Sequence, residues 1–367
     1  VGGKRYSSKD CYTKALELDT ETATAWCSLG EQGGGHVDDQ SYSSIACYAK
    51  ALELDWTNVK AWCNLGEEGG GHVDGQSYSS KECYMKALRL DSKSASGWCG
   101  FGEEGGGEVD GQSYSSIECY TKALELDRKH VKAWCGLGQE GGAKVDGQSY
   151  SSIECYISAL ELDPEKAKAW CFLAAQGGGH VAGQSYSSNK CCIRALELDS
   201  HNAEAWCSLG YAGGGKFAGQ TYSRKLCSIK ALEITINDSR AWFLLGEEGG
   251  GELNGRSFSQ QECFTKAVEL MPEDTSAWYR LGRLGGGTVY GQSYSSKECC
   301  IKALELDLNN AKAWFHLGSY EGGGEVHKEH CDTKSCYIKC LELDPENASV
   351  WYSFAADGGC EVNGLNY

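Results

Sequence analysis

Cysteine is the residue type with the most chemical potential in this chain, because 21 cysteines occur among 367 residues. Two series recur at a fixed spacing: Cys27, Cys63, Cys99, Cys135, Cys171 and Cys207 in one, and Cys47, Cys83, Cys119, Cys155, Cys191 and Cys227 in the other. Thiols in such a regular arrangement can pair as disulfides, which form and persist in oxidising compartments. The two series therefore predict a ladder of disulfides in a secreted or extracellular protein.

The sequence leaves the pairing and the redox state of these cysteines open. A member of the first series can join a cysteine that follows it, as Cys27 to Cys47, or one that precedes it, as Cys11 to Cys27. In the alternative interpretation, the cysteines are small buried apolar side chains of a cytoplasmic protein. Later in the chain Phe243 and Tyr279 replace the first-series cysteine, which favours this alternative there.

Other chemistry finds little support in the residue pattern. No nucleophile with a base, phosphate-binding loop or dinucleotide fingerprint is present, and the eight histidines do not recur as a set. Acidic pairs such as Glu67 and Glu68 lie near the loop residue Asp74 and resemble calcium ligands, but the equivalent of Asp74 is Ala182 further along. Adjacent cysteines lack the Cys-x-x-Cys partner of a zinc site. We expect no enzyme activity, no cofactor and no metal.

The elements that position the cysteines repeat every 36 residues. Tryptophan marks the period at Trp26, Trp62, Trp98, Trp134, Trp170, Trp206, Trp242, Trp278 and Trp314, and again at Trp351 after one inserted residue. A fixed period of about 20 to 50 residues is typical of stacked repeats, in which each unit covers its apolar face with its neighbours. The chain is therefore predicted to be one solenoid, 1–367.

Each period predicts two helices, which we name helix A and helix B. Helix A is expected over about 61–68 in the second period, where the glycines that follow at 69–71 end it. Helix B is expected to begin at Ser79, which forms a capping box with Glu82. Its buried stripe runs over 83–90 and includes the second-series cysteine. The glycine-rich segment between the two helices is interpreted as a loop.

These residues resemble a known repeat family. Trp26, Leu29, Gly30, Tyr48 and the KALELD segment at 50–55 resemble a tetratricopeptide repeat. The 36-residue period and the Gly-Gly-Gly-x-Val-x-Gly connection resemble the Sel1-like subfamily. The resemblance covers the whole chain and implies an all-α fold, a right-handed α-solenoid (superhelix) of about ten antiparallel helical hairpins.

The resemblance also bears on disulfides and partners. Cysteine-rich secreted Sel1-like proteins tie the two helices of one repeat together, which favours the Cys27 to Cys47 pairing. Tetratricopeptide adaptors of the chaperone type clamp a terminal carboxylate with a lysine and asparagines in helix A. The corresponding residues here, Cys63, Asn64 and Glu67, do not form that clamp.

Charge and local motifs limit the partners further. The formal net charge is −17, which makes DNA, RNA and anionic membrane surfaces poor partners. No run of 18 apolar residues predicts membrane insertion. Two sequons, at Asn237 and Asn347, are candidate N-glycosylation sites of a secreted chain.

The chain begins just before a helix B and ends just after a helix A. Apolar residues at these open half-repeats are candidates for an end-to-end contact: Cys11, Tyr12, Ala15 and Leu16 at one end, and Trp351, Tyr352 and Phe354 at the other. A head-to-tail contact between copies builds a filament or a ring. The leading hypothesis is thus a non-enzymatic, extracellular structural scaffold that polymerises. The alternative is an adaptor that binds a peptide or protein on its concave helix A face.

Overall fold

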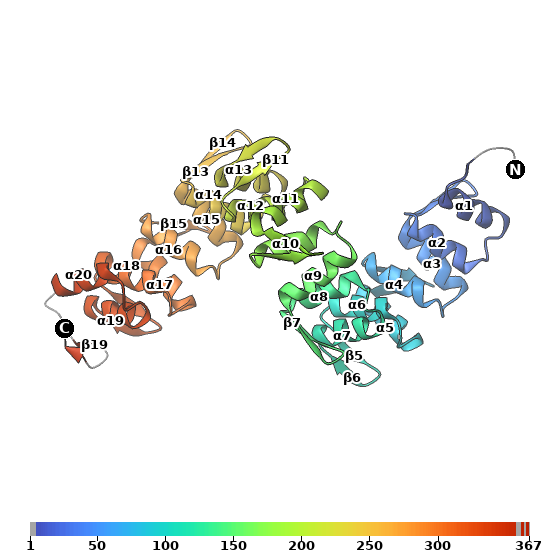
Figure 1. Ribbon diagram of the computed structural model, residues 1–367, viewed down its shortest axis with the longest axis horizontal. Coiled ribbons are helices and arrows are strands. Elements are labelled where there is room, and N and C mark those ends of the chain that lie inside the picture. The colour runs from blue at the N-terminus through green and yellow to red at the C-terminus, as the bar shows by residue number, and fades with distance from the viewer. Residues whose placement is uncertain (1–4, 357–360, 363–364, 367) are drawn as a thin grey trace. The chain divides into compact units, whose positions relative to one another are not determined.

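The computed structural model describes residues 5–356, 361–362 and 365–366. Within them helix A, a pair of short strands and helix B follow one another in each repeat (Figure 1). The chain divides into two compact units, unit 1 (Val1–Ser185) and unit 2 (Tyr186–Tyr367), whose boundary falls inside β10, Gln184–Ser187. The prediction of repeated helix pairs is confirmed within each unit, while the single solenoid over 1–367 stays a prediction.

Unit 1 alternates helix B (α1, α3, α5, α7, α9) with helix A (α2, α4, α6, α8, α10). The helices are α1 Ser8–Leu18, α2 Ala23–Glu31, α3 Ser44–Leu54, α4 Val59–Glu67, α5 Ser80–Leu90, α6 Ala95–Glu103, α7 Ser116–Leu126, α8 Val131–Gln139, α9 Ser152–Leu162 and α10 Ala167–Ala175. The strands are β1 Gly35–Val37, β2 Gln40–Tyr42, β3 Gly70–Val73, β4 Gln76–Ser79, β5 Gly107–Val109, β6 Gln112–Tyr114, β7 Gly142–Val145, β8 Gln148–Ser151 and β9 Gly178–Val181.

Unit 2 has the same alternation, with helix B at odd and helix A at even numbers. The helices are α11 Ser188–Leu198, α12 Ala203–Tyr211, α13 Arg224–Ile234, α14 Ser239–Glu247, α15 Gln260–Leu270, α16 Thr275–Arg283, α17 Ser296–Leu306, α18 Ala311–Glu321, α19 Thr333–Leu343 and α20 Ala348–Ala356. The strands are β11 Gly215–Phe217, β12 Gln220–Tyr222, β13 Gly250–Leu253, β14 Arg256–Ser259, β15 Gly286–Val289, β16 Gln292–Ser295, β17 Gly324–Val326, β18 Glu329–Cys331, β19 Glu361–Val362 and β20 Leu365–Asn366.

Helix B begins at a serine because that side chain supplies a hydrogen-bond acceptor to the free first turn. At α5 the Ser79 hydroxyl accepts from the backbone N–H of Glu82 at 3.3 Å, and the Glu82 carboxylate accepts from the N–H of Ser79 at 2.8 Å. The same reciprocal pair forms at every predicted capping box, which starts with Ser79, Ser115, Ser151, Ser259 and Ser295. The predicted helix B starts are therefore confirmed.

The connection from helix A to helix B is a β-hairpin and not the loop expected from its glycine-rich sequence. Strands β3 and β4 pair in antiparallel register from Gly70 opposite Ser79 to Val73 opposite Gln76. Asp74 and Gly75 form the two-residue turn, with φ angles of 48° and 75°. Two successive positive φ angles match the twist of a hairpin, and Asp-Gly is a common sequence for such a turn.

The core of each repeat is built around the helix A tryptophan. Trp62 is fully buried, its ring lies edge-on to Tyr78 of β4 at 5.0 Å, and its Nε1–H donates to the carbonyl of Trp56 at 2.9 Å. The other helix A tryptophans donate in the same way to the residue six positions earlier. These indoles are packing anchors between helix and hairpin.

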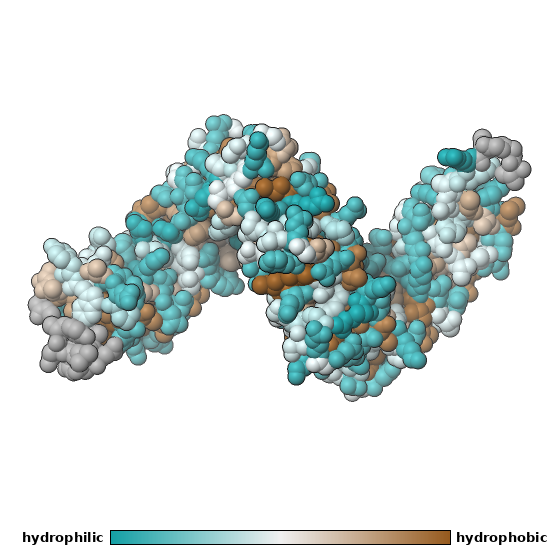
Figure 2. Space-filling view, in the orientation of Figure 1, coloured by the Kyte–Doolittle hydropathy of each residue, from teal (hydrophilic) through white to brown (hydrophobic). Residues whose placement is uncertain are grey.

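One face of the molecule is mainly polar. On the face that Figure 2 shows, hydrophilic residues predominate and hydrophobic residues form scattered patches. One leucine near the end of helix B is half-exposed in most repeats, such as Leu54, Leu90 and Leu126. Among the described residues, no helix has both the length and the apolar character needed to cross a bilayer.

Candidate functional site

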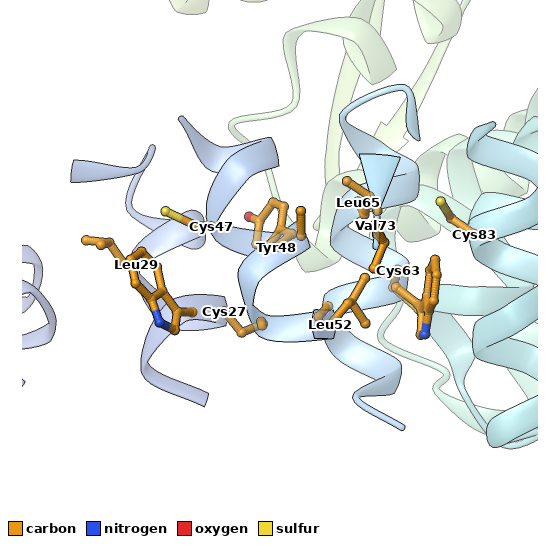
Figure 3. Packing of buried hydrophobic residues seen from close by; sticks show 14 of the residues in the cluster. Cys27, Leu29, Cys47, Tyr48, Leu52, Cys63, Leu65, Val73 and Cys83 are labelled. Carbon is orange, nitrogen blue, oxygen red and sulfur yellow. The ribbon is translucent and has the colours of Figure 1, made fainter. Parts of the chain in front are cut away.

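The described cysteines, from Cys11 to Cys340, are not joined as disulfides, while Cys360 lies outside the described residues. The predicted disulfide ladder therefore finds no support in the structure. The Cys47 sulfur points away from Cys27 in Figure 3. The side chains are therefore not oriented for the Cys27 to Cys47 disulfide that the family resemblance favours. Cys27 instead lies 3.9 Å from the Asn64 amide of the next helix A.

The second-series cysteines lie at a close contact between helix A and helix B. A Cβ atom on Gly102 would lie 3.1 Å from the Cys119 Cβ, and one on Gly210 would lie 3.2 Å from the Cys227 Cβ. A larger side chain than cysteine at these places would push the two helices apart. Packing thus gives a sufficient reason for the cysteine at this position, in agreement with the alternative interpretation of the sequence.

Burial also makes these thiols poor nucleophiles. It raises the pKa of Cys47 to about 11 and that of Cys119 to about 12, because a charged thiolate is poorly solvated inside the repeat. Only the thiolate reacts or binds metal, so these cysteines are chemically quiet at neutral pH. Within the described residues, no cluster of three or more cysteine, histidine or acidic side chains is arranged to hold a metal ion.

The remaining predicted sites differ in accessibility. Asn237 is exposed, whereas the Asn347 side chain donates to Asp344 at 3.0 Å and accepts from the N–H of Val350 at 3.3 Å. Glycosylation of Asn347 would disturb this helix start. Of the predicted end-contact residues, Cys11, Ala15 and Tyr352 are exposed, Tyr12 and Trp351 are half-buried, and Leu16 and Phe354 are buried within their own units.

The helix A face of unit 1 carries a ladder of charges. Lys60 at the start of α4 forms a 2.6 Å salt bridge with Glu31 at the end of α2. Lys132 of α8 pairs with Glu67 of α4, two repeats earlier. Burial raises the pKa of Glu103 on α6, while the charge of Lys132 opposes that rise. Successive helix A elements therefore neutralise one another along this face.

The helix A face of unit 2 begins with the same kind of pair. Arg280 of α16 holds Glu247 of α14 through two contacts, Nε to Oε1 at 2.8 Å and Nη2 to Oε2 at 3.1 Å. Arg240 lies 3.9 Å from Glu204 of α12. Between α16 and α18 the corresponding residues are both cationic: Arg283 ends α16, and Lys312 lies in the first turn of α18.

A cavity of about 430 Å³ lies between α14, α16 and the start of α18. Phe243 and Tyr279 line it, at the place where the first-series cysteine stands in earlier repeats. The Arg280–Glu247 pair and Lys312 contribute charged groups, and turn residues of the next two repeats add to the lining: Asp307, Asn309, Asn310 and Asp344. Thr275, Ser276 and Ala311 complete it. The lining is thus mainly polar and charged, with the Phe243 and Tyr279 rings as its large apolar surfaces.

Tyr279 is the central residue of this site. Burial raises its pKa, while the charges of Arg283 and Arg280 and a hydrogen bond with Arg283 oppose that rise. Its ring centroid lies 6.4 Å from that of His316 on α18. Burial lowers the pKa of His316, and the nearby charge of Arg283 adds to this effect, against that of Glu321. Arg283 is therefore close to Tyr279 of α16, which lines the cavity, and to His316 of α18, although Arg283 itself is not among the lining residues.

A second type of groove recurs on the hairpin side of the units. Tyr114, Glu118 and Lys122 line one of about 400 Å³, and Phe258, Glu262 and Lys266, 144 residues later, line one of about 290 Å³. Lys266 forms a 2.8 Å salt bridge with Glu269, and Lys122 lies over the Trp98 and Tyr114 rings. Lys266 and Lys122 are thus already engaged.

Comparison with known proteins does not identify a family or a function for this chain. No protein-family model and no curated protein matches the chain. One similar solved structure is the crystal structure of YrrB, "a TPR protein with an unusual peptide-binding site". It has 13% identity over 95% of this chain and 100% of that chain, with a TM-score of 0.16. A TM-score this low supports no argument about function.

The residues of the unit 2 cavity did not stand out in the sequence. The change from cysteine to Phe243 and Tyr279 was visible there but was interpreted only as evidence against disulfides. That change, together with Arg283 at a place that is Glu31 in the first full repeat, was the available signal.

Proposed function

We propose that this protein is a non-enzymatic repeat scaffold that binds a segment of a partner protein on the helix A face of unit 2. The cavity lined by Phe243 and Tyr279 carries this proposal. It draws residues from α14, α16 and the turns before α18 and α20, so it forms a trough across successive repeats. An extended peptide suits such a trough, since it offers side chains to the rings and backbone groups to the amides and carboxylates.

The test is binding of short peptides by the intact chain. A random peptide library is panned on the immobilised protein, and the enriched peptides are measured by fluorescence anisotropy. Phe243→Cys and Tyr279→Cys restore the residue that earlier repeats carry, so both variants are expected to fold and to lose roughly tenfold or more in affinity. Tyr290→Asn, which removes an exposed tyrosine from a hairpin turn, is the control. Peptides that bind all three variants equally would refute the proposed site.

A head-to-tail filament is a second proposal, supported by exposed apolar side chains at the two predicted contact surfaces. Tyr352 on α20 is 80% exposed, and Cys11 and Ala15 are exposed on α1. Light scattering over a concentration series tests it: growth in mass that Tyr352→Lys reduces supports the filament, and a constant monomer mass at high concentration rejects it. An extracellular location remains part of this proposal.

A further inference from the structure

Two successive helix A elements of unit 2 carry two cations at the positions where Glu31 and Lys60 form an ion pair in unit 1. Glu31 and Lys60, 29 residues apart, form a 2.6 Å salt bridge between the end of α2 and the start of α4. The equivalent residues of unit 2, also 29 apart, are Arg283 at the end of α16 and Lys312 at the start of α18. Two like charges repel one another, so an anion that binds both side chains would be stabilised by both.

Three of the acidic side chains around this step take part in other contacts. Glu247 holds Arg280 through two contacts. The carboxylate of Asp307 accepts the N–H of Asn309 at 2.9 Å, and Asp344 accepts the Asn347 amide at 3.0 Å, each within its own turn. In the described part of the chain, neither Arg283 nor Lys312 takes part in a salt bridge. Two cations therefore lack an acidic partner in a chain of net charge −17.

We infer that Arg283 and Lys312 bind an aspartate or glutamate side chain of the partner segment, whose neighbouring aromatic or large aliphatic side chain fills the cavity at Phe243 and Tyr279. This inference rests on the proposed function and names the chemistry of the partner. The ligand carboxylate takes the place that Glu31 has beside Lys60, and both cations donate charge-assisted hydrogen bonds to it. The side chain is internal to the segment, because the cavity continues across successive repeats and a chain passes along it.

Charge reversal tests the inference without loss of the fold. Arg283→Glu recreates the arrangement of Glu31 and Lys60, so the thermal midpoint is expected to stay level or rise while acidic peptides lose binding. Lys312→Glu removes the other cation. Lys302→Glu is the matched control, because it changes the net charge equally but lies on α17, where Lys302 pairs with Glu305 at 2.8 Å. We expect each of the first two variants to weaken binding roughly tenfold or more and the control to change it by less than about twofold.

The probes are peptides enriched by panning on the intact wild-type chain, synthesised with free and with amidated C-termini. An acidic residue within a few positions of an aromatic one, and equal binding of the two forms, support the inference. Binding that needs the free C-terminus, that lacks acidic residues, or that survives Arg283→Glu overturns it and leaves the proposed function standing. Binding that is also indifferent to Tyr279→Cys and Phe243→Cys overturns both.

Discussion

Gly66 of α4 lies directly against the ring of Tyr84 of α5, so closely that a Cβ atom on Gly66 would be 2.8 Å from the Tyr84 Cζ. Real Cβ atoms do not approach neighbours this closely, so the helix axes or the ring would have to move. The same glycine faces an aromatic ring in other repeats, as Gly102 faces Tyr120 and Gly246 faces Phe264. This contact sets how near helix A and helix B lie in the hairpins that have a glycine and an aromatic ring at these positions.

Gly66→Ala is therefore expected to destabilise the chain although alanine is the better helix former. Overpacking costs about 1 to 3 kcal/mol, which exceeds the gain of up to about 1 kcal/mol from helix propensity. A lower urea midpoint, followed by circular dichroism, measures the effect. Tyr84→Cys in the same chain recreates the pair of Ala174 and Cys192 found 108 residues later, and is expected to restore much of the loss. A single variant as stable as the wild type would contradict the tight contact.

The hairpin turns predict a gain in stability at Ala218. Its φ angle is 47°, in the left-handed region that alanine adopts only with strain and asparagine tolerates better. Ala218→Asn is expected to stabilise the chain by about 0.5 to 1 kcal/mol, read from the denaturation midpoint. Ala212→Asn, at a φ of −73°, is the control and should not stabilise. Equal effects at the two positions would show that the turn conformation is not responsible.

Exposure predicts which thiols react. In the native chain a thiol reagent at pH 8 is expected to modify Cys11 quickly, because Cys11 is exposed, while buried thiols such as Cys83 and Cys119 react only on unfolding. Mass mapping after a short pulse identifies the modified residue. Cys11→Ala is expected to remove the part of the fast phase that maps to residue 11. Fast modification of Cys83 in the folded chain would show that the helix contacts open readily.

The buried thiols also predict a loss of stability in alkali. Burial raises the pKa of Cys63 to about 11 and that of Cys83 to about 12, above the ordinary value of 9.0. Below pH 9 both states keep the proton, so the contribution of each thiol to stability is fully present. Above pH 9 only the unfolded state ionises, and each thiol costs about 1.4 kcal/mol per pH unit until its folded pKa is reached.

Thermal midpoints between pH 8 and pH 11 measure this slope. Buried tyrosines add to it, since burial also raises the pKa of Tyr48 to about 12 from 10.0. Cys83→Val removes one thiol and is expected to flatten the slope, whereas Cys11→Ala should leave the slope unchanged. A midpoint that stays constant up to pH 11 would mean that the thiols are not buried as neutral groups.

The sequence alone determined the features that depend on local interactions. The start of helix B follows from the capping box, whose two members stand three residues apart, as Ser79 and Glu82 do. The period of the tryptophans predicted the helix pairs, because each indole anchors the same packing unit. The hairpin was also locally encoded, in Asp74-Gly75, but a glycine-rich segment offers many conformations, and the pattern was interpreted as a loop.

Which residues lie together at the candidate site depends on the tertiary structure. Arg283 and Lys312 are far apart in the sequence, and only the stacking of α16 and α18 gives them the places of an ion pair. Likewise Lys132 reaches Glu67 across 65 residues. The state of the cysteines also depends on packing, since the spacing of Cys27 and Cys47 suits a disulfide, whereas the orientation of their side chains does not. The relative orientation and separation of stacked helices result from the packing of many side chains. The spacing of two residues in the sequence therefore does not determine whether their side chains meet.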